Sequence, residues 1–132
     1  MDLEIINIAS DTKNNRNIKG HTHYSNLKSS LCGDEIKISL IIKGDKIVDF
    51  GYEGKSCIYC QASASLLSKI SINNKIKKIN QLCKDAKLYF NGNLKISDRK
   101  WIILKKLFNK KNISRKNCIL LPFKTLQKIV SD

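Results

Sequence analysis

Hydrophobic residues change their spacing along the chain, and these changes predict where helices and strands lie. Residues 3–10 place apolar side chains at helical intervals, and the polar stretch 11–17 that follows is typical of an exposed loop. Further along, apolar and polar residues alternate on both sides of the turn Gly44-Asp45, which indicates two strands, each buried on one face. Residues 35–53 are therefore predicted to form an antiparallel hairpin.

Helical spacing returns after Gly54 and continues, with interruptions, to the end of the chain. Pro122 is placed in the first turn of the last predicted helix, where proline is tolerated. The predicted fold class is α+β: a small antiparallel β-sheet, made of the hairpin 35–53 and open to a third strand, packed against several α-helices. The four predicted helices run from Gly54 to about Asn73, over about 75–84, from Ser97 or Asp98 through Phe108, and over about 119–130.

Length and the even spread of apolar residues predict a single domain over residues 1–132. A domain of this size buries roughly two-thirds of its unfolded surface, so a metal would be there for chemistry rather than to make the chain fold. No apolar run reaches the roughly 20 residues of a membrane span, and the first residues lack the order of a secretory signal. We therefore expect a cytoplasmic protein without a membrane partner, whose five cysteines are metal ligands or reactive thiols rather than a disulfide framework.

The formal net charge of +14 first suggests a polyanionic partner. Composition weakens that interpretation, because the chain has 22 Lys but only 3 Arg, and arginine is the usual residue for bidentate phosphate and base recognition. The excess of Lys, Ile and Asn over Ala, Arg and Pro is typical of an A+T-rich genome. The lysine pairs 105–106 and 110–111, near Trp101 and Phe108, are expected to be a solvated face over a core stripe, and nucleic acid is disfavoured as a partner.

Three cysteines fall at the boundaries of predicted elements, where a turn can present a side chain. Cys32 precedes the first predicted strand, Cys57 precedes the first long helix, and Cys118 lies at the start of the last helix, so the helix N-termini favour thiolate at the latter two. Three thiolates need a fourth ligand for tetrahedral zinc, and Asp34 can reach the same centre across Gly33. Spacing alone leaves an equal alternative, in which the three cysteines are buried as small hydrophobes.

The motifs around these cysteines add a resemblance. The first cysteine stands in C-G-D, the second in G-x-x-C-x-x-x-x-A-S-A-S after the hairpin, and the third opens the last helix, in that order from about residue 20 to the end. In this the chain resembles the NifU-like iron–sulfur cluster assembly family, which includes the IscU and SufU proteins. The matching segments are 31–36, 47–50, 54–58, 62–65 and 115–126.

Details within the motifs resemble the SufU branch more closely than the IscU branch. Asn117 stands where IscU proteins have histidine, Arg115 and Cys118 form the R-x-x-C of SufU, and the segment between the second and third cysteines is longer than in IscU. One departure concerns the loop before the first cysteine, which has Ser29-Ser30 where the family usually has Asn-Pro. That replacement places the rigidity of the loop in question.

The resemblance implies a zinc site made of Cys32, Asp34, Cys57 and Cys118, in a sulfurtransferase that accepts persulfide sulfur from a SufS-like cysteine desulfurase and works with other SUF assembly proteins. In the SufU branch a histidine of the partner replaces the first cysteine on zinc, which would free Cys32 as the catalytic thiol. The alternative is a scaffold that assembles a [2Fe–2S] cluster bound by Cys32, Cys57 and Cys118. A basic zinc module that binds nucleic acid is a remote alternative.

Four further residues have metal-binding chemistry but are given other roles. Cys60 makes a C-x-x-C with Cys57, yet the family motif does not require it, so it is predicted to be a packed small residue, with a spare ligand or persulfide acceptor as the alternative. Cys83 is predicted to lie in the core. His21 and His23 form an H-x-H pair that can bind metal, but a role in a loop or a partner contact is preferred.

Overall fold

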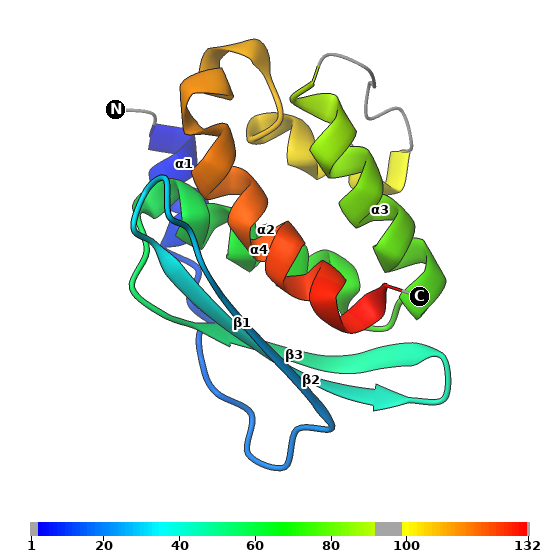
Figure 1. Ribbon diagram of the computed structural model, residues 1–132. Helices are drawn as coiled ribbons and strands as arrows, with labels where there is room; N and C mark the ends of the chain where they lie inside the picture. Colours follow the sequence, from blue (N-terminus) through cyan, green and yellow to red (C-terminus); the bar gives the residue numbers. More distant parts are fainter. Residues whose placement is uncertain (1–2, 92–98, 132) are drawn as a thin grey trace.

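A three-stranded antiparallel sheet forms one layer of the molecule, and helices pack over one of its faces (Figure 1). The computed structural model describes residues 3–91 and 99–131. The predicted α+β class is confirmed. The elements in chain order are α1 (Leu3–Ala9), β1 (His23–Lys28), β2 (Glu35–Lys43), β3 (Lys46–Glu53), α2 (Ile58–Ser71), α3 (Ile76–Tyr89), the 3-10 segments η1 (Arg99–Lys106) and η2 (Lys110–Arg115), and α4 (Lys116–Val130).

The predicted hairpin is the pair β2–β3, and the third strand is β1, which pairs with the outer edge of β2. Ile38 faces Tyr52 and Leu40 faces Phe50 across the hairpin, and all four side chains are buried. Alternation along β2 therefore predicted the buried face correctly, because side chains of a strand point in turn to opposite faces. β1 runs antiparallel to β2, so its last residue, Lys28, pairs with the first residue of β2, Glu35.

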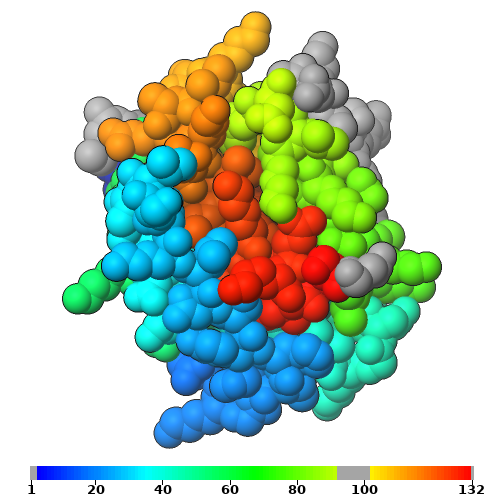
Figure 2. Space-filling view, viewed as in Figure 1, coloured from blue at the N-terminus to red at the C-terminus, as the bar shows by residue number. Residues whose placement is uncertain are grey.

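Two helices make the main contact with the sheet. α4 packs on β1 and β2, while α2 packs on β3 and against α4. Ala62 and Ala64 are fully buried, and the Ser63 hydroxyl between them donates a 2.6 Å hydrogen bond to the Ile119 carbonyl of α4. Small side chains on α2 thus allow the two helices to approach closely. Figure 2 shows α4, orange to red, between the blue-to-cyan segment around β1 and the green α3.

Three helix predictions need correction. α4 begins at Lys116 rather than Ile119, so Pro122 lies inside the helix, where it cannot donate a hydrogen bond to the Cys118 carbonyl four residues earlier. The predicted helix through Phe108 is a 3-10 segment over Arg99–Lys106, and its expected cap at residues 97–98 lies outside the described residues. α3 continues to Tyr89 rather than ending near residue 84, because Ala86 still packs in the core.

The polar stretch 11–17 is not exposed throughout. Asn14 is only 5% exposed: its Nδ2 donates to Ser68 Oγ at 2.9 Å, and its carbonyl accepts a hydrogen bond from the Tyr52 N–H at 3.0 Å. The stretch therefore joins β3 to α2. Within residues 3–91 and 99–131, every helix falls short of the length and apolar character that a bilayer crossing requires.

Candidate metal centre

The turn between β1 and β2 carries the first two predicted site residues, Cys32 and Asp34. Gly33 between them has φ 74°, a left-handed conformation that costs glycine little, and its N–H donates to the Ser29 carbonyl at 2.9 Å. The Ser29 N–H in turn donates to the Asp34 carbonyl at 2.8 Å. These bonds close the turn and hold the exposed Cys32 thiol at its tip.

Ser29 also holds the turn through its side chain. Its hydroxyl oxygen accepts hydrogen bonds from the backbone N–H groups of Leu31 and Cys32, each at 3.3 Å. Serine therefore constrains this loop where the family usually has Asn-Pro. Ser29 was not predicted to be a positioning residue, although a serine three residues before the cysteine can form such a side-chain turn.

The Asp34 carboxylate reaches from this turn to the start of α2. Its Oδ2 accepts a 3.0 Å hydrogen bond from the backbone N–H of Cys57, the N-cap residue of α2. The N-cap of α2 has no side-chain hydrogen bond of its own, so the carboxylate supplies a negative group near a helix N-terminus, where it is favourable. Asp34 thereby fixes the position of the second cysteine relative to the first.

Cys118 approaches from the other side, in the first turn of α4, and is 7% exposed. The pKa of its thiol is raised, first by burial and then by the neighbouring thiols of Cys57 and Cys32. The Cys118 thiol therefore lies near the thiols of both Cys32 and Cys57. Burial outweighs the helix N-terminus, which was expected to favour thiolate at Cys118. Arg115, the N-cap of α4, places its guanidinium 5.2 Å from the centre of the Tyr59 ring, which links the start of α4 to the first turn of α2.

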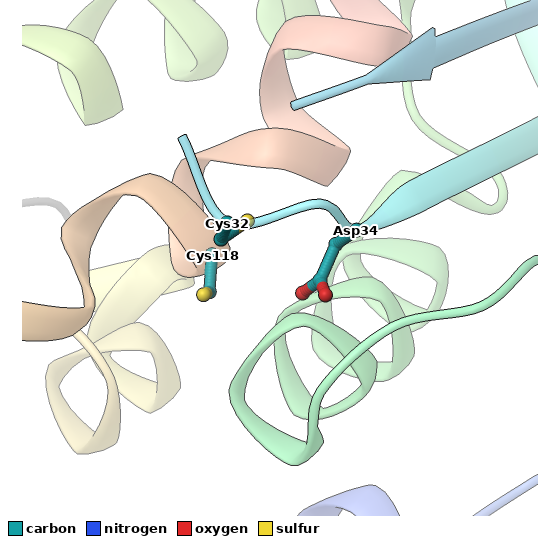
Figure 3. A group of neighbouring side chains, drawn as sticks. All are labelled: Cys32, Asp34 and Cys118. Carbon is teal, nitrogen blue, oxygen red and sulfur yellow. The ribbon is translucent and has the colours of Figure 1, made fainter. Parts of the chain in front are cut away.

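Three ligand atoms form a compact group. The sulfurs of Cys32 and Cys118 and a carboxylate oxygen of Asp34 all lie within 4.8 Å of one another (Figure 3). Figure 3 shows the first turn of α4 facing the turn that carries the other two side chains. Cys57 is not a member of this compact group, but its thiol is near enough to Cys118 to raise the pKa of that thiol, and its backbone N–H donates a hydrogen bond to Asp34.

The donor set fits a zinc ion. Tetrahedral zinc with ligands at roughly 2.1–2.3 Å needs ligand atoms about 3.4–3.8 Å apart, so an inward movement of about 1 Å would suffice for the group of Cys32, Asp34 and Cys118. Thiolates and a carboxylate are ordinary zinc ligands, and rotation of Cys57 would supply a fourth. The arrangement can hold a zinc ion or another metal that binds thiolate.

The remaining two cysteines are buried rather than presented at this surface. Cys60 and Cys83 are fully buried, as expected for packed residues. Burial is the main cause that raises the pKa of both thiols, in the case of Cys83 to about 12, so neither offers a thiolate at neutral pH. In the C-x-x-C motif, the Cys57 thiol therefore lies near the site, whereas the Cys60 thiol points into the core from the first turn of α2.

The H-x-H pair lies away from the cysteines. His23 pairs with Leu40 at one end of the β1–β2 ladder, whereas the Cys32 turn follows the other end. His21 Nδ1 lies 2.9 Å from the Ile18 carbonyl, and His23 Nδ1 lies 2.8 Å from Thr22 Oγ1. Neither histidine belongs to the group of metal-ligating atoms found among the described residues.

The fold and the site define a class: a small α+β protein with cysteines and an aspartate gathered where the sheet meets two helix N-termini. Comparison with known proteins identifies the family. A family model described as NifU-like N terminal domain matches residues 4–90, a range that includes Cys32, Asp34 and Cys57. The chain therefore belongs to the NifU-like family of iron–sulfur cluster assembly proteins, together with the IscU and SufU proteins.

Individual relatives support this assignment. The iron–sulfur cluster assembly scaffold protein IscU of Thermotoga maritima is 32% identical over 102 residues, which cover 76% of this chain and 70% of that protein. A Borreliella burgdorferi protein of no stated function is 33% identical over 115 residues, covering 86% and 79%. A crystal structure from Fervidobacterium islandicum, described as an iron–sulfur cluster assembly scaffold protein for the SUF system, has a TM-score of 0.91 at 26% identity and covers 99% of this chain and 96% of that chain.

Proposed function

We propose that this protein is a SufU-like, zinc-dependent sulfurtransferase that accepts persulfide sulfur from a cysteine desulfurase. One observation carries the proposal: the exposed thiol of Cys32 lies within 4.8 Å of both the Asp34 carboxylate and the buried thiol of Cys118. A thiol that lies in a ligand group and is open to solvent can both bind metal and meet a partner protein.

The four proposed ligands have different parts in this function. Asp34, Cys57 and Cys118 would hold the metal, because they are more buried than Cys32 and lie on the starts of β2, α2 and α4. Bound zinc would keep the coordinating cysteines as thiolates at neutral pH. Cys32 stands on a turn, so it can leave the group without moving a helix or strand.

The sulfur transfer itself is a thiol–persulfide exchange. The Cys32 thiolate attacks the outer sulfur of a persulfide on the desulfurase cysteine, and a new S–S bond forms at Cys32. The S–S bond of the desulfurase persulfide breaks, and its cysteine leaves as a thiolate. Cys32 then carries the persulfide, and the step needs no external oxidant or reductant.

Local sequence supports the SufU branch. Asn117 precedes Cys118 where IscU proteins have histidine, and Arg115 supplies the R-x-x-C arginine, whose guanidinium stacks on Tyr59. The similarity to the Fervidobacterium protein, described as belonging to the SUF system, points the same way. On this proposal the partner is a SufS-like desulfurase, and the sulfur passes on to other SUF assembly proteins.

A scaffold function is the second candidate, because the Thermotoga and Fervidobacterium relatives are both described as assembly scaffolds. The Cys118 thiol has the thiols of Cys32 and Cys57 as neighbours, and thiolates also ligate [2Fe–2S] clusters. In that function the cluster is cargo that the protein builds and hands on.

Metal analysis of anaerobically purified protein, together with its absorption spectrum, separates the two functions. The proposal expects about one zinc per chain and no visible absorption band. A brown protein that contains iron and acid-labile sulfide would favour the scaffold and contradict the zinc-dependent transferase.

A further inference from the structure

Two hollows adjoin on the exposed face of α4. One, of about 180 Å³, lies between α4 and residues 27–31, and the other, of about 320 Å³, lies between α4 and the end of α3 near Lys87 and Phe90. Asn117 and Lys124 line both hollows, which lie on either side of the same stretch of α4; the two hollows together are here named the α4 groove. Figure 2 shows α4 between the flanking segments that make its walls.

The groove carries positive charge, and only Lys28 among its lysines also borders a hollow with acidic residues, Glu35 and Glu53. Lys28, Lys87, Lys116 and Lys124 line it, and the described residues around the two hollows include no Asp or Glu. A cleft lined by one sign of charge concentrates the field and attracts ligands of the opposite sign. The hollow on the other side of the Cys32 turn differs, because Glu35 and Glu53 lie among its lysines.

Apolar side chains add a second binding element. Leu31, which is 76% exposed, and Leu121 line the smaller hollow, whereas Phe90 and Leu120 line the larger. Sites for small molecules usually measure roughly 300–1,000 Å³ and enclose their ligand. Two shallow hollows on either side of one helix, of which one is below that range, fit side chains of an extended segment that crosses α4 better than one compact molecule.

The groove adjoins the proposed metal centre directly. Leu31 and Asn117 line it, and they are the chain neighbours of Cys32 and Cys118. A segment bound in the groove would therefore lie beside the Cys32 thiol. Affinity in the groove would hold a partner protein where sulfur can be exchanged.

We propose that the α4 groove binds an extended acidic segment of a partner protein, with apolar side chains that enter the two hollows. The identification of the partner as the cysteine desulfurase rests on the proposed function, whereas the preference of the groove for an acidic segment is independent of it.

Nucleic acid fits the groove less well. Among the described residues that line the groove, the cations are all lysines, with no arginine for bidentate phosphate contacts, and the one aromatic residue is Phe90, too few for a stacking platform.

Fluorescence anisotropy with a labelled synthetic peptide of repeating Asp-Leu-Glu-Leu tests the groove. The variant Lys87→Glu/Lys116→Glu/Lys124→Glu should bind this peptide about tenfold more weakly or worse. The control Lys43→Glu/Lys46→Glu/Lys77→Glu makes the same change of net charge at the β2–β3 turn and the start of α3, and should bind within about twofold of the wild type. The variant Lys87→Gln/Lys116→Gln/Lys124→Gln should have a peptide affinity between those of the wild type and the Glu triple. This graded result guards against a folding defect as the cause of the loss in the Glu triple.

Three comparisons can overturn the inference. Equal losses of peptide affinity in the groove triple and the control triple would show that net charge alone attracts the peptide. If an Asn-Leu-Gln-Leu peptide bound as tightly as the Asp-Leu-Glu-Leu peptide, acidic side chains would have no part in binding. Tighter, groove-dependent binding of a deoxythymidine oligonucleotide of equal charge would assign the groove to nucleic acid.

The desulfurase is tested separately, by sulfur transfer to the same variants. Cys32→Ala should bind the peptide like the wild type, so failure of the proposed sulfur chemistry leaves the peptide result readable. The groove triple should accept sulfur about tenfold more slowly at a desulfurase concentration below saturation. A groove triple that loses the peptide but accepts sulfur at the wild-type rate would overturn the desulfurase as the occupant.

Discussion

The backbone N–H of Cys57 donates a hydrogen bond to Oδ2 of Asp34 at 3.0 Å. This bond joins the turn before β2 to the N-cap of α2, two points that are 23 residues apart in the chain. One carboxylate thus lines the candidate metal centre and also positions the element that carries the second cysteine. Metal affinity and local structure should therefore respond differently to changes at this residue.

Asp34→Ala removes both the ligand oxygen and the hydrogen-bond acceptor, and should weaken zinc binding by about 10–100-fold. Asp34→Asn keeps an oxygen that can accept the bond from the Cys57 N–H but lacks the charge, so it should lose zinc affinity while the apoprotein keeps its stability within about 0.5 kcal/mol. Chelator competition measures the first property and denaturant unfolding the second. Zinc affinity unchanged in Asp34→Ala would remove this residue from the ligand set.

Ser29→Ala tests how the turn is held. The change removes the oxygen that accepts hydrogen bonds from the Leu31 and Cys32 N–H groups, and two long bonds at 3.3 Å contribute modestly. Zinc affinity should fall about three- to tenfold, because Cys32 loses part of its preorganisation. Ser30→Ala is the matched control and should stay within about twofold; equal losses in both variants would contradict a positioning role for Ser29.

The raised pKa of the Cys83 thiol predicts that the folded protein loses stability in alkaline solution. Burial raises the pKa of its thiol from 9.0 to about 12 in the folded protein, so above pH 9 the unfolded chain loses a proton that the folded chain keeps. The stabilising contribution is complete below pH 9 and declines as the pH rises towards 12. Between pH 8 and 10 the loss from this thiol should be about 1.4 kcal/mol.

Denaturant unfolding of the reduced, metal-free protein at the two pH values measures this loss. Cys83→Ala should lose about 1.4 kcal/mol less than the wild type over the same interval, whatever its stability at pH 8. Other groups that titrate in this range are common to both proteins and cancel in the comparison. An identical pH dependence in the two proteins would contradict the raised pKa.

The hairpin and the fold class could be predicted because alternation in β2 reports directly which face is buried. In β3 the alternation was misleading at the start of the strand, where Ile47 rather than Val48 is buried beside the register shift at Ile41–Ile42. The starts of α2 and α4 carry no capping signal, because their N-cap residues are Cys57 and Arg115 rather than Ser, Thr, Asp or Asn. The end of α2, the start of α3 and the end of α4 were predicted to within two residues. The burial of Asn14 depends on Ser68, 54 residues away, and nothing in the local sequence indicates such a contact.

The candidate site was only partly accessible from the sequence. The positions of Cys32, Cys57 and Cys118 at element boundaries followed from the periodicity, but their meeting at one place depends on how β1, α2 and α4 pack. The resemblance to the NifU-like family supplied that step. The contributions of Ser29 and the Asp34–Cys57 bond are visible only in the folded chain.

The most direct test of the account is the mass of the Cys32-containing peptide after the protein is incubated with a SufS-type desulfurase and cysteine. The account predicts one additional sulfur atom on Cys32, removable by a reducing agent, and no acceptance of sulfur by the Cys32→Ala variant. Cys83→Ala, altered only in the core, should accept sulfur like the wild type. Transfer to Cys32→Ala at the wild-type rate, or additional sulfur only on another cysteine, would contradict the central claim.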